Sequence, residues 1–163
     1  MKKITYPIIS IIILILINAC ADYKPIYTTD LQFRIADYSI KSNKKLGRQI
    51  YSKLYNLSKF SEDNAEAQNV NIIIDVKKDK KATAKDSAGK ILEYRIILNG
   101  NIMIKDYLTD EEVLNHNFSH SFTYKVQDQY SETILLEKKS IESLINKVYQ
   151  NLMIKMSEIM LAQ

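Results

Sequence analysis

His116 and His120 are the only histidines in the sequence, and their spacing of four is one that metal sites use. On a helix, two histidines four residues apart share a face and can ligate one zinc ion. In a strand, the same spacing separates the side chains by about 13 Å. Residues 113–124 alternate between larger side chains and Asn, Ser or Thr, which predicts a strand. We therefore expect both histidines to be half-buried structural residues.

Other patterns that signal catalysis are missing from the sequence. It contains no G-x-S-x-G, no glycine loop that could cradle a phosphate and no H-E-x-x-H. With a single cysteine it offers no Cys/His cluster for a metal ion. The carboxylates are scattered, mostly in expected loops or on solvated helix faces. We expect a protein that is not an enzyme and that holds neither a metal nor a cofactor.

The single cysteine, Cys20, follows a segment with the features of an export signal. Lys2 and Lys3 precede an apolar run over 4–17, which as a helix would span about 21 Å. That length is less than the roughly 30 Å hydrocarbon core of a bilayer. A free thiol on an exported chain would be unusual. Lipid attachment through a thioether would remove it.

The end of this signal resembles that of bacterial lipoproteins, in which a cysteine after a small residue becomes the lipidated start of the mature chain. Ala19 and Cys20 fit this pattern, whereas Asn18 stands where Ala or Ser is more usual. The resemblance implies a signal peptide over 1–19 and a covalent lipid anchor on Cys20. The alternative is an uncleaved anchor with a buried thiol.

The mature chain would be long enough for one domain with a single core, over 33–163, after a short tether at 20–32. Removing Lys2 and Lys3 from the 23 basic residues leaves 21, against 19 acidic residues. Such a near balance gives no indication of nucleic-acid binding.

The first half of the domain predicts a strand, a helix and a second strand. Residues 33–40 carry apolar side chains on both sides, which predicts a strand buried on two faces. Ser42 and Asn43 offer a helix N-cap, and apolar residues at steps of three and four predict a helix over 43–60. Alternating apolar residues predict the second strand over 70–76.

The second half predicts a hairpin, two more strands and a long helix. The lysine-rich stretch 77–90 predicts the hairpin region, and its lysines are either a solvated tip or contacts for an anion. Strands are expected over 91–106 and 113–124. Ser131 is a good N-cap for a final helix of about 30 residues. The apolar stripe of that helix comprises Ile134, Ile141, Ile145, Val148, Leu152, Met156 and Ile159, broadened by Leu135, Leu144, Met153 and Met160.

The element order β-α-β-β-β-α predicts an α+β two-layer sandwich. A strand–helix–strand start favours a parallel pair, and short later connections favour antiparallel pairs. Because each helix has one apolar stripe, we expect both helices on one face of a mixed four-stranded sheet. The uncovered face would carry the polar side chains of 93–105 and 115–123.

Two segments resemble the lipopolysaccharide-assembly lipoprotein family, LptE. Residues 20–27, CADYKPIY, are similar to the start of the mature family members, in which an aromatic residue, a Pro and a Tyr follow the lipidated cysteine. Ala21 stands where Gly is usual. Residues 118–136 resemble the family's final strand and the entry to its last helix. The element order and mature length also match.

This resemblance implies a lipoprotein on the periplasmic side of the outer membrane of Gram-negative bacteria. Members of the family plug the large β-barrel LptD, help it to assemble and contact lipopolysaccharide. A sheet face of Asn, Ser and Thr would suit the polar wall of a water-filled barrel. An acylated Cys20 would hold the plug at the membrane.

If the chain contacts lipopolysaccharide, the charge and placement of seven cations make them candidate contacts for the phosphates of lipid A. Arg suits bidentate phosphate contacts, and Lys acts as a point charge. The candidates are Arg95 and Lys105 on the bare sheet face, and Lys77, Lys78, Lys80, Lys81 and Lys85 at the hairpin tip.

A second function remains open: a lipid-anchored periplasmic accessory subunit of a lipid-transport ABC system or of another envelope complex. In that case a patch on the helix side, rather than the bare sheet face, would be the partner surface.

Overall fold

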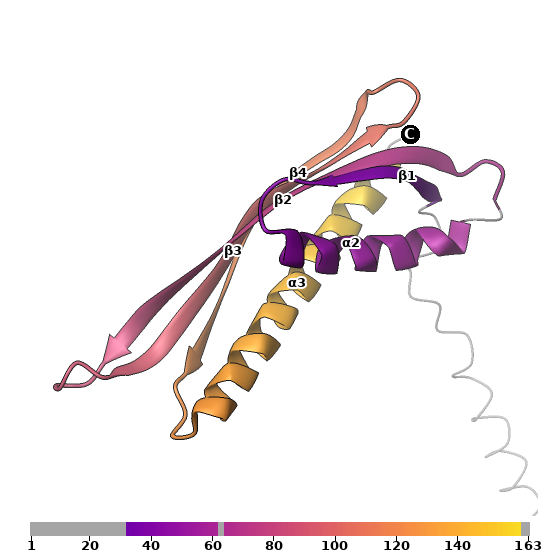
Figure 1. The fold of residues 1–163 in the computed structure, drawn as a ribbon. Coiled ribbons are helices and arrows are strands. Elements are labelled where there is room, and N and C mark those ends of the chain that lie inside the picture. Colours follow the sequence, from indigo (N-terminus) through magenta and orange to yellow (C-terminus); the bar gives the residue numbers. More distant parts are fainter. Residues whose placement is uncertain (1–31, 62–63, 161–163) are drawn as a thin grey trace, which may run out of the picture.

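The computed structural model describes residues 32–61 and 64–160 (Figure 1). The proposed signal peptide and Cys20 lie outside these residues, and only Gln32 of the proposed tether lies within them. The elements are β1 (Phe33–Ile40), α2 (Lys44–Ser58), a 3-10 turn η2 (Lys59–Ser61), β2 (Gln68–Lys85), β3 (Ile91–Asp106), β4 (Glu112–Lys125) and α3 (Tyr130–Met160).

The four strands form one sheet in the order β1-β2-β3-β4. β1 pairs with β2 in parallel, and the other two pairs are antiparallel. Both helices lie on the same side of the sheet (Figure 1). The α+β class, the mixed sheet and the order β-α-β-β-β-α are thus as the sequence predicts.

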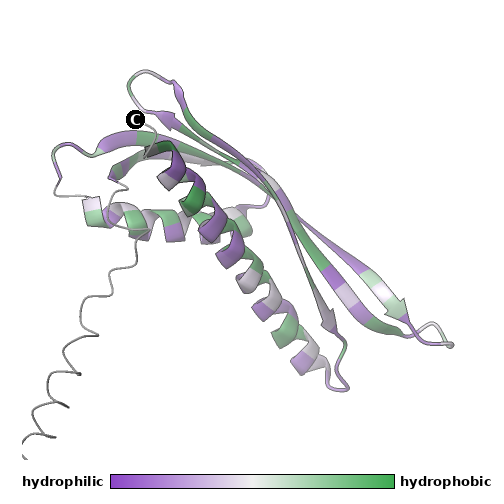
Figure 2. Cartoon of the chain, turned by 180° about the vertical axis from the view of Figure 1, so that it is seen from behind, coloured by the Kyte–Doolittle hydropathy of each residue, from purple (hydrophilic) through white to green (hydrophobic). Residues whose placement is uncertain are grey.

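The core lies between the sheet and the two helices. β2 contributes every second residue from Val70 to Val76, and α2 contributes Ile50 and Leu54. The predicted N-cap is confirmed at Asn43, whose side chain accepts a hydrogen bond from the backbone N–H of Leu46 at 3.1 Å. The cap satisfies one of the N–H groups that a helix start leaves unpaired. Figure 2 shows apolar residues interspersed with polar residues along both helices.

The prediction that β1 is buried on two faces is wrong. Ala36 has no partner in the register, because the pairing steps from Ile35 opposite Val70 to Asp37 opposite Asn71. This one-residue bulge reverses the alternation, so that the apolar residues before and after it point to the same face. β1 is therefore an edge strand with one apolar face.

The prediction of a hairpin region over 77–90 is also wrong in extent. β2 continues to Lys85, and only residues 86–90 form the turn. Asp86 closes the turn by accepting hydrogen bonds from the backbone N–H groups of Ala88 and Lys90, each at 2.9 Å. The β2–β3 hairpin consequently projects beyond the helices (Figure 1).

The long helix begins one residue before the proposed cap Ser131, at Tyr130. Its apolar stripe is confirmed from Leu144 to Met156, but Ile134 and Leu135 are exposed. The buried positions of the first turns are the polar residues Thr133 and Ser140. Three other large apolar side chains of the predicted helix over 43–60 and the predicted strands over 91–106 and 113–124 are also exposed: Phe60, Leu92 and Phe122.

Gly100 on β3 lies close to the backbone of β2. A Cβ atom at this position would overlap the backbone oxygen of Asp75 on β2 and would lie 2.8 Å from the ring of Phe118 on β4. The site therefore requires a residue without a side chain.

In the described part of the chain, no helix combines the length and the apolar character that crossing a bilayer needs.

Candidate functional site

The sheet face that points away from the helices is polar, as the sequence predicts. Its centre is a hydrogen-bonded group of three asparagines on neighbouring strands. The side-chain amide of Asn101 on β3 donates to Asn115 at 2.5 Å and to Asn117 at 3.0 Å, both on β4. Every second residue of β4 from Asn115 to Thr123 faces this side and is exposed. We call this surface the open face.

Charges of both signs alternate along β2 on the open face. Asp75, Lys77, Asp79 and Lys81 occupy successive positions of the same parity. Asp79 accepts a hydrogen bond from Asn99 at 3.4 Å. The open face is therefore hydrophilic without a strong net charge, and it suits contact with water or with a polar wall.

Two cations interrupt this balance. Lys81 on β2 and Arg95 on β3 are direct cross-strand partners, and like charges in such pairs repel. The Nε atom of Arg95 donates to the hydroxyl of Thr123 at 3.3 Å. Within the described residues, neither cation has a carboxylate within 4.0 Å. An anion placed between them would offset their repulsion.

Lys105 lies on the open face but does not belong with Arg95. It forms an ion pair with Asp110 at 2.8 Å, at the β3–β4 turn. Ten residues of β3 separate it from Arg95, a distance of about 33 Å along a strand. The two predicted contacts therefore cannot share one phosphate.

Lys78 and Lys80 are not at a hairpin tip, as the sequence analysis proposed, but on the helix-facing side of β2. Both form ion pairs with Glu137 on α3, at 3.2 Å and 2.6 Å. The ammonium of Lys80 also lies 4.1 Å from the ring centroid of Tyr94. Tyr124 completes the group, because its hydroxyl donates to Glu137 at 3.1 Å. These lysines connect β2 to α3 and are not free for a ligand.

Lys80 and Glu137 each stabilise the charged form of the other. Burial alone would raise the pKa of Glu137, but the hydrogen bonds from Lys80 and Lys78 outweigh it, and the pKa is lowered. Burial would lower the pKa of Lys80, but the hydrogen bonds to Glu137 and Tyr124 outweigh it, and the pKa is raised. Both shifts favour the charged pair.

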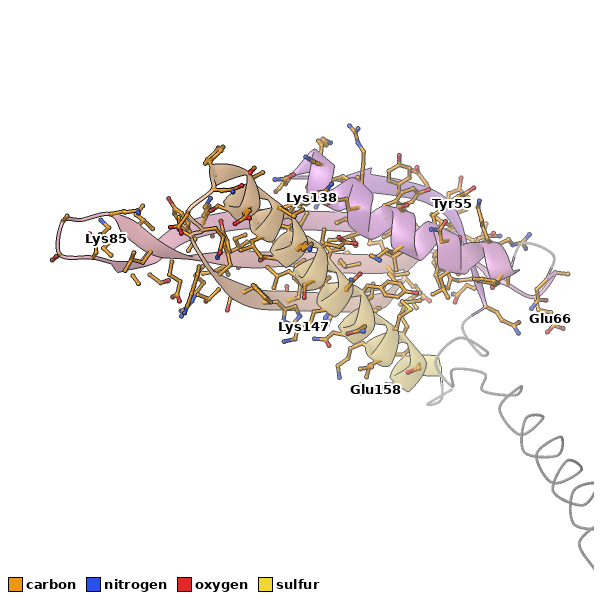
Figure 3. The ribbon with its side chains drawn as sticks, turned by 90° about the horizontal axis from the view of Figure 1, so that it is seen from below. Tyr55, Glu66, Lys85, Lys138, Lys147 and Glu158 are labelled. Carbon is orange, nitrogen blue, oxygen red and sulfur yellow. The ribbon has the colours of Figure 1, made fainter. Side chains whose placement is uncertain are left out.

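Of the proposed tip lysines, only Lys85 lies close to the turn, at the end of β2 (Figure 3). The seven predicted cations therefore separate into four groups. Lys81 and Arg95 adjoin on the open face, with Lys77 further along the same face of β2. Lys105 lies at the opposite end, Lys78 and Lys80 bind Glu137, and Lys85 lies at the turn.

The two histidines lie in a strand, and they face α3. The ring of His120 lies 3.1 Å from the side-chain amide of Asn151. Burial and then Lys155 lower the pKa of His116, and burial and then Lys147 lower that of His120. No three His, Cys, Asp or Glu residues come together as metal ligands in the described ranges.

Two hollows lie on the described surface, and neither is lined by Lys81 or Arg95. An apolar cavity of about 50 Å³ lies between the start of β2 and Met156 of α3. It is far smaller than the roughly 300 Å³ at which small-ligand sites begin. A polar hollow of about 270 Å³ lies at the β3–β4 turn, beside Asp106 and Glu111. Recognition by Lys81 and Arg95 would therefore take place on an open surface.

Glu137 was not predicted as a partner of the lysines, although the alternation of side chains along β2 holds part of the signal. Lys78 and Lys80 have the same parity as the buried residues Ile74 and Val76. Continuing the strand past Val76 would have placed both lysines on the helix side. The contact with Glu137 itself spans 57 residues from Lys80 and has no local signature.

Comparison with known proteins shows a structural likeness. No family model and no curated protein matches the sequence. The fold is similar to a minor lipoprotein from Acinetobacter baumannii, with a TM-score of 0.55, 11% identity, and coverage of 78% of this chain and 93% of the other.

Two further lipoproteins are similar at comparable levels. Rare lipoprotein B from Shewanella oneidensis has a TM-score of 0.50 and 14% identity, with coverage of 78% of this chain and 99% of that one. Lipoprotein B from Nitrosomonas europaea has a TM-score of 0.51 and 12% identity, with coverage of 77% and 85%. This chain has the fold of these bacterial lipoproteins.

Proposed function

We propose that this chain is a lipid-anchored lipoprotein of the outer membrane that plugs an LptD-like β-barrel and helps it to assemble for lipopolysaccharide insertion. The observation that carries the proposal is the open face, where the polar group of Asn101, Asn115 and Asn117 remains uncovered while both helices lie on the other side. The fold shared with bacterial lipoproteins supports it.

The open face has the chemistry that a barrel lumen requires. The interior of a large outer-membrane barrel is polar, whereas its lipid-facing wall is apolar. Asn, Ser and Thr side chains can hydrogen-bond to such a lumen without the desolvation cost of unpaired charges. In this role the chain binds and positions and does not catalyse, and Cys20 supplies the covalent anchor.

A bulky residue in the middle of the open face tests this role. We expect Asn101→Trp to reduce recovery of the barrel with the tagged, detergent-solubilised chain by tenfold or more, because the lumen wall would be held away from the sheet. Ser143→Trp, on the exposed side of α3, is the matched control. Equal recovery of the barrel with both variants, or recovery of no barrel with the wild-type chain, would refute the plug.

Lipopolysaccharide contact is assigned to Lys81 and Arg95, the cation pair without a carboxylate partner among the described residues, with Lys77 further along the same face of β2. A phosphate could accept from both cations and would replace their repulsion by attraction. We expect Lys81→Gln with Arg95→Gln to weaken binding of purified lipopolysaccharide at least fivefold. The matched control is Lys138→Gln with Lys139→Gln, two exposed lysines of α3. Unchanged binding by the first pair would remove the assignment.

The accessory-subunit function makes the opposite prediction. The partner would then contact the helix side, so that Ser143→Trp would disturb the complex and Asn101→Trp would not. Inner-membrane transport components would be recovered in place of a barrel.

A further inference from the structure

β4 is an edge strand whose free backbone groups can be assigned from the register. Val126 donates from its N–H to the carbonyl of Leu92 at 2.9 Å, in line with the pairing of Glu93 with Lys125. Hydrogen-bonded and non-hydrogen-bonded pairs alternate in an antiparallel ladder. The even-numbered residues of β4 therefore bond to β3. The residues that direct their N–H and C=O groups to the free edge are Asn115, Asn117, Ser119, Ser121 and Thr123.

Nothing in β4 blocks this edge. Residues 113–124 contain no Lys, Arg, Asp, Glu or Pro, and the only irregularity of the β3–β4 ladder lies at its end, between Ile104 and Lys105. Proteins usually protect exposed edges with charges, prolines or bulges. β4 carries none of these along 12 residues of neutral strand.

The opposite edge strand, β1, is protected where β4 is not. β1 is only eight residues long, and the bulge at Ala36 interrupts it. The carboxylate of Asp37 also accepts a hydrogen bond from the backbone N–H of Tyr38 at 2.7 Å. One edge of the sheet is thus protected by a bulge and a carboxylate, whereas no described segment pairs with the other edge.

The side chains of β4 are complementary to a second copy of the same strand. In an antiparallel pair centred on Ser119, Asn117 would lie opposite Ser121 on the open face. On the helix side, Phe118 would lie opposite His120, and His116 opposite the exposed Phe122. Aromatic and hydroxyl or amide pairs of these kinds stabilise antiparallel strands. At the ends, Glu112 and Lys125 of different copies would come close, and no like charges would face each other.

We propose that β4 is the interface of a homodimer, in which two copies pair antiparallel about Ser119 to form a continuous eight-stranded sheet. The flank of α3 beside this edge would contribute. Lys147 and Glu158 lie on the side of α3 away from α2 (Figure 3), and the exposed Ile154 is two turns beyond Lys147. In the dimer, the two α3 helices run antiparallel below the paired strands. The proposal does not rest on the plug. A barrel lumen would cover the same edge, so a chain inside a barrel could not form this dimer.

Variants of the acylated mature chain that each carry one added cysteine, studied in mild detergent, test the register. At the centre, Ser119→Cys places two thiols in a hydrogen-bonded pair with Cα atoms about 5.5 Å apart, which a disulfide can span. We expect oxidation to yield a disulfide-linked dimer for Ser119→Cys. Asn117→Cys and Ser121→Cys should each link poorly alone and efficiently when mixed.

The wild-type chain is the control for Cys20, which remains in every variant. Equal cross-linking of Asn117→Cys and Ser119→Cys would indicate random collision and would overturn the proposal. A Ser119→Cys chain that stays monomeric under oxidation would also overturn it.

A second experiment measures the protein mass of the detergent complex without cross-linking. Ser119→Pro removes an N–H that points away from β3 and has no backbone partner among the described residues, and prolines are accepted on edge strands. Ser121→Lys places a charge at the edge and keeps the backbone intact. Both variants should unfold at nearly the wild-type temperature but shift the protein mass in the detergent complex from dimer to monomer. A wild-type chain that is already monomeric, or folded variants that stay dimeric, would refute the interface.

Discussion

The ammonium of Lys80 and the carboxylate of Glu137 lie 2.6 Å apart and join β2 to the first turns of α3. This contact lies where the apolar stripe of α3 has ended, because Ile134 and Leu135 are exposed. Polar interactions thus hold the beginning of α3 to the projecting hairpin, and apolar contacts hold its second half to the core.

Replacing the carboxylate should loosen this junction. We expect Glu137→Gln to lower the free energy of unfolding by about 1–2 kcal/mol. Hydrogen bonds to charged groups contribute roughly 1.5–3 kcal/mol, and the glutamine oxygen can still accept a weaker hydrogen bond from a lysine. The Glu137 side chain is only 16% exposed, so solvent screens the pair less than at an open surface. Urea unfolding measures the change.

Glu142 on the exposed side of α3 provides the control for that variant. Glu142→Gln should change the unfolding free energy by less than about 0.5 kcal/mol. Equal effects of the two substitutions would show that the Lys78–Glu137–Lys80 group contributes no stability.

Substitution of Gly100 in β3 should destabilise the fold more than substitution of Gly89 in the β2–β3 turn. We expect Gly100→Ala to cost about 3 kcal/mol or more, because the new Cβ atom would collide with the backbone oxygen of Asp75, which cannot move without breaking the ladder. Gly89→Ala should cost only about 1–2 kcal/mol. Its φ of 85° is unfavourable for alanine, but nothing lies near the added atom. Thermal unfolding of the two variants should separate them clearly.

The two histidines should make stability depend on pH. Burial and neighbouring lysines lower the pKa of His116 and of His120 in the folded chain. As the pH falls below the unfolded histidine pKa of about 6.5, the unfolded chain therefore binds more protons than the folded chain. Stability should be complete above this value and fall as the pH drops from about 6.5 toward the folded pKa values. A variant with His116→Gln and His120→Gln should lose this slope in urea unfolding between about pH 7.5 and 5.5.

Asp106 should titrate at unusually low pH. Hydrogen bonds from the Gln68 side chain and from the backbone N–H groups of Thr109 and Leu108 lower its pKa to about 2. Carboxyl NMR titration should show this value. Gln68→Ala should move the pKa of Asp106 upward, because the first of these hydrogen bonds is lost. A pKa that Gln68→Ala leaves unchanged would mean that the turn alone holds the carboxylate.

Much of the fold could be predicted because its signals are local. The third strand was predicted over 91–106 and is observed as Ile91–Asp106, since its alternation is uninterrupted. The failures come from interactions between distant segments. Near the start of α3, the contact with the sheet is made by the ion pairs of Glu137 and not by an apolar side chain. These ion pairs form only because β2 places Lys78 and Lys80 next to Glu137.

The candidate site could be predicted only in part. Alternation correctly separated the open face from the core face, so the polar group around Asn101 was expected. The grouping of the cations was not, because it depends on which residues lie opposite each other. The pairing of Lys81 with Arg95 follows from a hairpin turn at 86–90, and the sequence had suggested a much longer hairpin region.

The unpaired residue Ala36 has a consequence for how relatives of this chain would look. A chain that lacked this residue could keep the same strand in the same place, yet its apolar positions would follow a simple alternation. In an alignment of the two sequences without a gap, the apolar positions of the two strands would coincide on one side of Ala36 and differ by one residue on the other. An insertion of one residue can therefore hide common ancestry within a strand whose three-dimensional position has not changed.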